Sequence, residues 1–321
     1  MKSIYSDDLK LDDFKNCLSS DFEWYYTCVV IFQKHYSAKQ EFSVAYSLLY
    51  SLKERNQFKV SSSSMKEEID HRLVILKLLQ NQKILKSKIL EVNDFTVTLN
   101  VAGHEKDFLI DLGAELSSTS KLGVSKESVG VSSFTGTKYL FSPEILTVGE
   151  DDEILFFTNA THNILGQNFV KKYSKIIFQA DPKKTYVTRF FQDGSSIFFF
   201  GAVNYDDSKF DRLRFCIDTG SSDTVIMPKA YRKLRDKIIH LELLTHSLNE
   251  LGGKGNLLGK ILPKVDLIIG NSKKTMQNVV AIAKSNASLT CDVVLGRDYL
   301  SHKLVAIDFS NMEIYFRSDS L

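Results

Sequence analysis

Two aspartates occupy similar surroundings in this 321-residue chain. Asp111 follows the apolar run Phe108-Leu-Ile and precedes Leu-Gly-Ala, whereas Asp218 follows Phe215-Cys-Ile and precedes Thr-Gly-Ser-Ser. In each copy an apolar strand leads an aspartate into a glycine turn. If the fold brings the two carboxyl groups together, like-charge repulsion keeps one of them protonated. Such a pair can activate a water molecule, with one group as general base and the other as general acid.

A second motif repeats downstream of each aspartate. The segment 163–170, Asn-Ile-Leu-Gly-Gln-Asn-Phe-Val, resembles the segment 293–300, Val-Val-Leu-Gly-Arg-Asp-Tyr-Leu. A strand-like tail follows each segment, and the order of elements is the same in both copies. The second copy is longer between its aspartate and its glycine. The sequence therefore predicts two related lobes, and each lobe contributes one aspartate.

The elements that must position these residues change character along the chain. Before about residue 88 the apolar residues recur at helical spacing. Three Ser-x-x-Glu/Gln patterns, which begin at Ser20, Ser37 and Ser64, have the form of helix capping boxes. After residue 88, short runs rich in β-branched and aromatic residues alternate with turn residues, which indicates an all-β barrel or sandwich.

These patterns predict the fold class α+β. We expect an N-terminal helical domain, followed by an all-β domain of two lobes. The predicted boundaries are residues 1–88 for the helical domain, 89–192 for the first lobe and 193–321 for the second lobe. Because each lobe brings a single aspartate, the two lobes together form one functional unit.

The second copy resembles a known family. Asp218-Thr-Gly-Ser-Ser between two apolar runs resembles the active-site segment of aspartic proteases, and Val293-Val-Leu-Gly resembles the second marker of that family. The short lobes are more similar to retroviral-type (retropepsin-like) proteases than to secreted pepsins. The resemblance covers the β-rich part of the chain. It implies an acid-protease-like fold with barrel-like lobes and an aspartic endopeptidase activity.

The resemblance also implies roles for individual residues. Asp111 and Asp218 would be the catalytic pair, and Gly113 and Gly220 would allow the turns that present them. Thr219 matches the threonine whose hydroxyl clasps the opposite loop.

Further positions match family residues that hydrogen-bond the catalytic carboxylate or form the flap over the substrate. Ser221 matches the position that hydrogen-bonds the catalytic carboxylate. Gly252 and Gly253 match the tip of a flap that closes over the substrate, and the segment 134–137 is a weaker flap candidate in the first lobe.

Leu112 departs from the family pattern, which has threonine or serine at this position. Leucine cannot make the hydroxyl clasp, so we expect an asymmetric set of hydrogen bonds between the lobes. Two alternatives to the single-chain protease remain open at this point. One is a catalytically silent binding or adaptor module, and the other is a protease that is active only as a homodimer through its second lobe.

Composition limits the remaining classes. The chain has 41 basic and 39 acidic residues, which gives a formal net charge of +2, so neither nucleic acid nor an anionic membrane is an expected partner. The seven histidines lack metal-ligand spacing, and we expect no metal and no cofactor. The expected partners are a peptide or protein substrate and a protein that binds the helical domain, with the chain acting as a monomer or a homodimer.

The cysteines and the first residues bear on the compartment. The four cysteines are scattered along the chain, and their spacing suggests no disulfide framework. The first residues are acidic where a signal peptide has an apolar run, and no stretch reaches the length of a membrane span. We therefore expect a cytoplasmic protein with unpaired cysteines.

Overall fold

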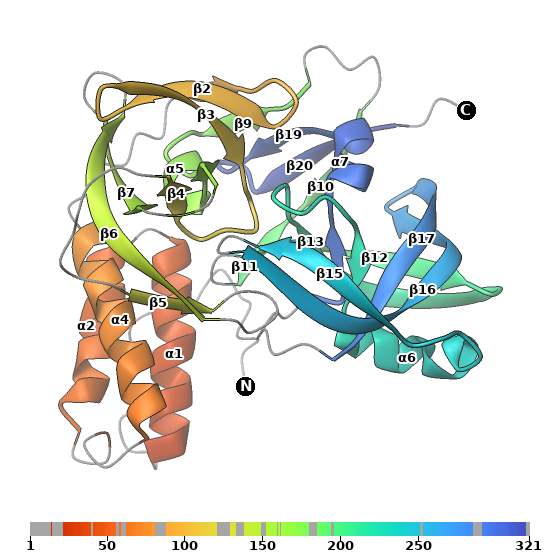
Figure 1. Cartoon of the computed structure of the whole chain (residues 1–321), viewed down its shortest axis with the longest axis horizontal. Coiled ribbons are helices and arrows are strands. Elements are labelled where there is room, and N and C mark those ends of the chain that lie inside the picture. The colour runs from red at the N-terminus through yellow and green to blue at the C-terminus, as the bar shows by residue number, and fades with distance from the viewer. Residues whose placement is uncertain are drawn as a thin grey trace. The chain divides into compact units, whose positions relative to one another are not determined.

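The computed structural model describes part of the chain. The described residues are 14, 22–39, 41–55, 58, 62–80, 88–120, 129–132, 138–148, 152–158, 160, 162–179, 185–193, 196–250, 253–284 and 291–318. The chain forms two compact units. One comprises Met1–Lys83 with Gln192–Ser195, and the other comprises Ile84–Phe191 with Ser196–Leu321. Helices build the first unit and strands dominate the second, so the fold class is α+β (Figure 1).

The first unit contains three described helices of two turns or more. They are α1 (Phe22–Ala38), α2 (Phe42–Lys53) and α4 (Ser63–Leu79). Their apolar faces pack together around Val29, Leu52 and Leu76, which are almost completely buried. On each helix, other buried residues lie at helical spacing from the named one, as the periodicity of the sequence predicts.

The capping boxes are not where the sequence pattern places them. Ser37 lies inside α1, and α2 starts behind Glu41, whose side chain makes no capping hydrogen bond. Ser64 lies inside α4, and the capping residue is Ser62, whose side chain accepts a hydrogen bond from the Met65 N–H. In a serine-rich stretch, neighbouring serines compete for this role, so the pattern locates the helix start only within a few residues. Ser20 lies outside the described residues.

The first lobe of the β unit is a closed barrel. Its strands follow the order β2-β3-β8-β4-β7-β6, and a bridge from Val101 to Val148 pairs β2 with β6 and closes the ring. Strand β5 adds to the outer side of β6. The bounds are β2 (Thr96–Val101), β3 (His104–Ile110), β4 (Ser117–Thr119), β5 (Val129–Ser132), β6 (Lys138–Val148), β7 (Asp152–Thr158) and β8 (Ile164–Leu165), with the short helix α5 (Gln167–Val170) behind β8.

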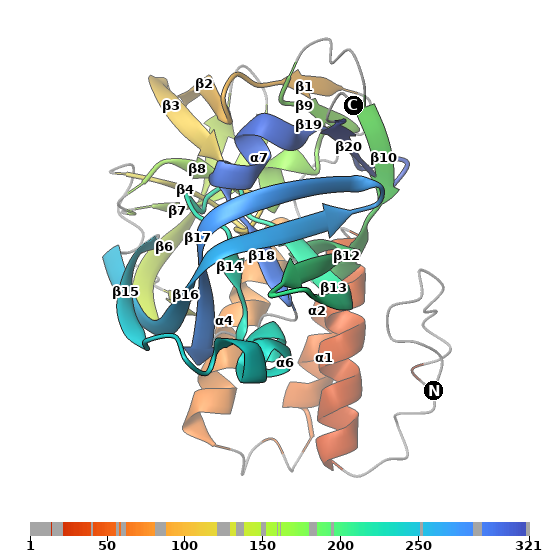
Figure 2. The same cartoon turned by 90° about the vertical axis from the view of Figure 1, so that its right-hand side faces the viewer.

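The second lobe repeats this arrangement. Its strands follow the order β12-β13-β18-β14-β17-β16, the pairing of β12 with β16 closes the ring, and β15 adds to β16 (Figure 2). The bounds are β12 (Ser196–Tyr205), β13 (Ser208–Ile217), β14 (Val225–Ile226), β15 (Leu244–Glu250), β16 (Gly253–Ile269), β17 (Ser272–Lys284) and β18 (Val293–Leu295), with β11 (Phe191–Asp193), α6 (Pro228–Ile238) and α7 (Arg297–Lys303).

A third sheet joins the two lobes. It has the order β1-β9-β19-β20-β10, and at its centre β9 of the first lobe pairs antiparallel with β19 of the second. Ile176 lies opposite Ile307, and Ile177 lies opposite Ala306. The bounds are β1 (Ile89–Glu91), β9 (Lys175–Ile177), β10 (Thr185–Arg189), β19 (Leu304–Asp308) and β20 (Glu313–Arg317). Because β19 is buried along its whole length, this sheet is part of the shared core.

The expectation of unpaired cysteines is wrong for Cys28, Cys216 and Cys291, which are all disulfide-bonded. Cys216 and Cys291 are bonded to each other with a Cα–Cα distance of 5.8 Å, within the usual range for such bonds. Cys216 lies on β13 and Cys291 lies just before β18, which is the parallel neighbour of β13. Seventy-five residues separate the two cysteines, so only the tertiary pairing of these strands brings them together.

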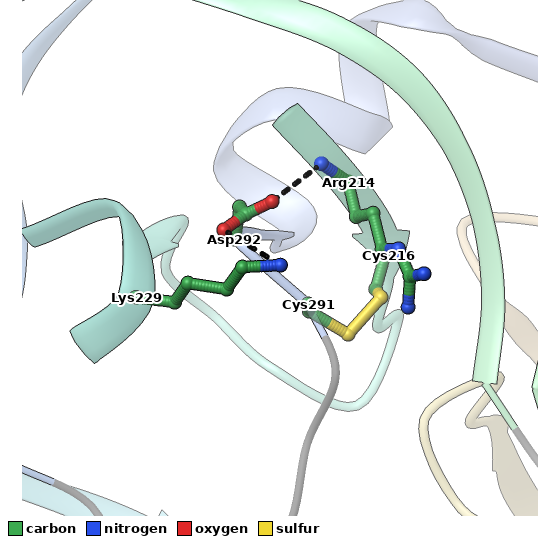
Figure 3. Close-up of polar contacts among 5 residues, drawn as sticks. All are labelled: Arg214, Cys216, Lys229, Cys291 and Asp292. Atoms are coloured by element: carbon green, nitrogen blue, oxygen red, sulfur yellow. Dashed lines mark hydrogen bonds and ion pairs between the residues drawn. A yellow bond between two sulfur atoms is a disulfide. The ribbon is translucent and has the colours of Figure 1, made fainter. Parts of the chain in front are cut away.

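A buried carboxylate lies beside the disulfide (Figure 3). One oxygen of Asp292 accepts a hydrogen bond from the main-chain N–H of Arg214 at 3.0 Å, and the other faces the Lys229 ammonium at 4.0 Å. The Asp292 N–H donates in turn to the Arg214 carbonyl. Together with the disulfide, these bonds fix the start of β18 against β13, the strand that precedes Asp218.

In the ranges that the structure describes, no helix combines the length and the apolar character needed to cross a membrane.

Replacing Cys216 and Cys291 together with alanine should lower the free energy of unfolding by about 2–4 kcal/mol, because the crosslink restricts the unfolded chain over a long loop. Urea unfolding of the wild type and the double variant measures this difference. Peptide mapping without reductant should recover both cysteines in one linked peptide, and their recovery as two free thiols would contradict the pairing.

Candidate active site

Asp111 lies in a turn held by main-chain hydrogen bonds. It directly follows Ile110, the last residue of β3, and its own N–H donates to the carbonyl of Leu165 on β8 at 3.0 Å. The N–H groups of Gly113 and Ala114 both donate to Oδ1 of Asp111, at 2.9 and 3.0 Å. The carboxylate is therefore fixed by the backbone of its own turn.

Asp218 lies in the matching turn of the second lobe. It follows Ile217 at the end of β13, and its N–H donates to the carbonyl of Leu295 on β18 at 3.0 Å. Gly220 and Ser221 donate their N–H groups to Oδ1 of Asp218, both at 3.1 Å. Main-chain N–H groups at equivalent positions donate to both carboxylates, so the two turns are related as the sequence repeat predicts.

The two turns meet at their glycines. A Cβ atom placed on Gly113 would lie 2.5 Å from Cγ of Asp218, and one placed on Gly220 would overlap the carboxylate of Asp111. Glycine is thus required at both positions by close approach. Each carboxyl group thus lies against the glycine of the opposite turn and is close enough to affect the pKa of the other carboxyl group. A single chain therefore brings Asp111 and Asp218 together.

The environment raises the pKa of both carboxyl groups. Desolvation, followed by the charge of Asp218, raises the pKa of Asp111 to about 8, although the N–H groups of its turn oppose this shift. Desolvation also raises the pKa of Asp218, against the N–H groups of its own turn, the hydrogen bond to Asp111 and the charge of Arg297. A pair of this kind holds a single proton over a wide pH range.

Thr219 connects the two turns. Its hydroxyl accepts a hydrogen bond from the Leu112 N–H at 3.0 Å and donates one to the Ile110 carbonyl at 2.6 Å. These three residues are fully buried. Leu112, at the equivalent position of the first lobe, has no hydroxyl to return these bonds and packs instead in the core. The clasp is therefore one-sided.

Ser221 contacts the carboxylate of Asp218 through its backbone. Its N–H donates to Asp218, whereas its hydroxyl donates to the carbonyl of Asp223 at 2.8 Å. The second lobe thus uses the main chain here, as the first lobe does with Ala114.

The flap candidates are only partly described. Gly253 is the first residue of β16 and lies opposite Glu250 at the end of β15, so it belongs to the antiparallel pair that extends from the second barrel. Gly252 and the segment 134–137 lie outside the described residues.

Two further residues contact the aspartate turns and were not among the predicted site residues. Gln167 and Arg297 each follow the glycine of the second motif, and each donates its main-chain N–H to the opposing turn of its own lobe at 2.9 Å, to Ala114 and Ser221 respectively. Their matched positions in the repeat were visible in the sequence, but the direction of their side chains was not.

Within the described ranges, no group of three or more His, Cys, Asp or Glu side chains is placed to hold a metal ion.

Comparisons with known proteins give structural neighbours only. No protein-family model matches the chain, and no curated protein matches it. Among solved structures, an aspartic proteinase from Irpex lacteus is 13% identical, with a TM-score of 0.44, and the match covers 70% of this chain and 94% of that one. Basic 7S globulin from soybean is 11% identical with a TM-score of 0.40, covering 70% and 91% of the two chains.

A third neighbour is a retropepsin-like aspartic protease from Rickettsia conorii. It is 17% identical with a TM-score of 0.29, and the match covers 42% of this chain and 91% of that one. Because these identities and TM-scores are low, we assign no function to the chain from these neighbours.

Replacing Thr219 with valine should lower the free energy of unfolding by about 2–4 kcal/mol, because one buried N–H and one buried carbonyl would lose their partner. Thr219→Ser keeps the hydroxyl and should retain most of the stability. Chemical unfolding of both variants measures the difference. Equal stability of the valine and serine variants would show that the clasp contributes nothing.

Proposed function

We propose that the chain is an aspartic endopeptidase that hydrolyses peptide bonds with a water molecule held between Asp111 and Asp218. The observation that supports this proposal is the close approach of the two turns, in which each glycine lies against the opposite carboxyl group and each carboxyl group is held by a matched strand and turn. Paired carboxyl groups with raised pKa values fit general acid–base chemistry on water.

The proposed reaction balances with one shared proton. The ionised carboxylate takes a proton from the water, whose oxygen bonds to the carbonyl carbon of the scissile peptide, while the protonated carboxyl gives its proton to the carbonyl oxygen. The gem-diol then collapses: the C–N bond breaks, the nitrogen keeps the electron pair and takes the proton from the first carboxyl. The second carboxyl recovers its proton from a gem-diol hydroxyl, so the pair returns to its starting state.

The substrate in this proposal is a peptide or an extended protein segment. Gly252 and Gly253 are proposed as part of a flap over the substrate, since the β15–β16 pair extends beyond the closed barrel. The helical unit is proposed to select substrates, bind a protein partner or cover the site.

The alternatives are less well supported. A silent binding module does not need the two carboxyl groups to approach each other, yet each of them lies against the glycine of the opposite turn. A dimer through the second lobe needs Asp218 to face its own copy, whereas here it faces Asp111 of the same chain. We therefore propose catalysis within one chain.

A cytoplasmic location remains a prediction. Its argument from unpaired cysteines no longer holds, because Cys216 and Cys291 are bonded and structural disulfides persist mainly in oxidising compartments.

Asp111→Asn and Asp218→Asn should each lower kcat/KM by about 100- to 10,000-fold, because each change removes one member of an acid–base pair. A diverse peptide library at mildly acidic pH, read by mass spectrometry, measures cleavage. Asp211→Asn is the matched control, since Asp211 lies on the same strand as the Asp218 turn but is exposed and pairs with Lys209.

The outcomes separate the alternatives. Loss in both active-site variants with normal cleavage by Asp211→Asn supports the single-chain pair. Loss in Asp218→Asn alone indicates the homodimer. Cleavage that persists in both variants defeats the assignment.

A further inference from the structure

Helix α6 carries a basic surface on the outside of the second barrel (Figure 2). Its apolar residues Ala230, Leu234 and Ile238 are buried, and the helix packs against β17. Its polar side has five basic residues and one acidic residue within positions 229–237. This run alone carries more positive charge than the whole chain, whose formal net charge is +2. The near-neutral total therefore averages away a local positive patch.

Three of these cations lack a counter-ion in the part of the chain that the structure describes. Arg232, Lys233 and Arg235 are exposed, and within the described ranges none of them forms an ion pair. The two lysines at the ends of the run each face one carboxylate, at 4.0 and 3.6 Å. Arg232, Arg235 and Ile239 are spaced by three and four residues, so they lie along one stripe of the helix, which ends at the αR residue Ile239.

Three exposed aliphatic side chains lie at the C-terminal end of this stripe. Ile239, Leu243 and Leu258 are 69%, 49% and 48% exposed. The fold brings them to one place, because Lys260, two residues after Leu258 on β16, donates to the Ile239 carbonyl at 3.1 Å. In addition, the residue after Leu243 lies opposite the residue after Leu258 in the β15–β16 pair. Exposed apolar side chains that gather beside charged groups are typical of an interaction surface.

This surface begins at the end of the second barrel that is remote from the aspartate turn. Strand β14 runs antiparallel to β18, and β18 ends at Leu295, whose carbonyl accepts the Asp218 N–H. The chain therefore leaves the turn along β14 and enters α6 beside Asp292, at the start of β18, where the Met227 N–H donates to the Asp292 carbonyl. A partner that binds at the start of α6 does not occupy the place of a substrate at Asp218.

We propose that the basic side of α6 and the three aliphatic side chains beside it bind the surface of an anionic membrane. Charge complementarity selects this occupant: anionic lipids present a plane of phosphates and negative charge to Lys and Arg side chains, and arginine binds phosphate with two N–H groups. The aliphatic side chains would enter the boundary between headgroups and acyl chains. A protein partner fits less well, because lysine is depleted from protein interfaces and this patch contains three. The inference goes beyond the proposed function and does not depend on it.

Sedimentation of the full chain with lipid vesicles tests this inference. We expect binding to phosphatidylcholine vesicles that contain about one-third phosphatidylserine, and weakening of this binding by salt. Arg232→Gln with Arg235→Gln should lower the partition coefficient about 25-fold, or about fivefold for each charge. Arg189→Gln with Arg317→Gln is the matched control, since it removes the same charge from exposed positions on β10 and β20, and it should bind like the wild type.

A second variant tests the aliphatic side chains. Ile239→Ser with Leu243→Ser should weaken binding to the same vesicles about tenfold and leave its dependence on salt unchanged. Both side chains are at least half exposed or nearly so, and a thermal melt of each variant verifies that the protein is folded.

The outcomes decide between a membrane and other polyanions. Equal binding by the folded double-arginine variant and its control would overturn the proposal, as would equal binding of the wild type to vesicles of pure phosphatidylcholine. Binding to poly-glutamate without binding to the anionic vesicles would overturn it too and would indicate an acidic protein partner. Peptide cleavage enters none of these measurements, so their failure leaves the protease proposal standing.

Discussion

The contact between two carboxyl groups is the constraint on which the rest of the β unit depends. Like charges at hydrogen-bond distance cannot both be ionised easily, so the pair retains a proton that isolated aspartates lose near pH 4. The fold must then hold two carboxyl groups together although burial and their mutual repulsion disfavour their ionised forms. It does so with main-chain N–H donors from both turns, with glycines that leave room for the opposite carboxylate, and with the central sheet that joins the lobes. Because the folded state binds the proton of Asp111 more tightly than the unfolded chain, this pair weakens the fold as pH rises from about 4 toward about 8.

Departures from symmetry are concentrated around this contact. The barrels, the turn donors and the central strand pairing repeat closely, whereas the side chains at two matched positions do not: Leu112 corresponds to Thr219, and Gln167 corresponds to Arg297. Thr219 clasps the first lobe without a return bond from Leu112, and Gln167 anchors the first turn by its amide. At the matched position of the second lobe, the main-chain N–H of Arg297 donates to the Ser221 carbonyl. In a symmetric homodimer both aspartates would have identical surroundings, whereas the two lobes of this chain give Asp111 and Asp218 different surroundings.

The local patterns were sufficient to predict the two lobes, the two aspartate turns and the helical first unit, since each depends on short-range periodicity and on repeated motifs. The helix starts were predicted less well, because adjacent serines such as Ser62 and Ser64 compete to cap the same helix. The disulfide could not be predicted, because 75 residues separate its cysteines and strand pairing alone brings them together. The contact of Gln167 with Leu112 likewise depends on how the strands pack, although its place in the repeat marked the position.

Carboxyl-carbon NMR titration of the aspartates tests the shared proton most directly, and it needs no knowledge of the substrate. The account predicts that Asp111 titrates far above 3.8, toward about 8, and that Asp218→Asn lowers this value because a neighbouring negative charge is removed. Independent titrations of both residues near 3.8, with Asp111 unaffected by Asp218→Asn, would contradict it.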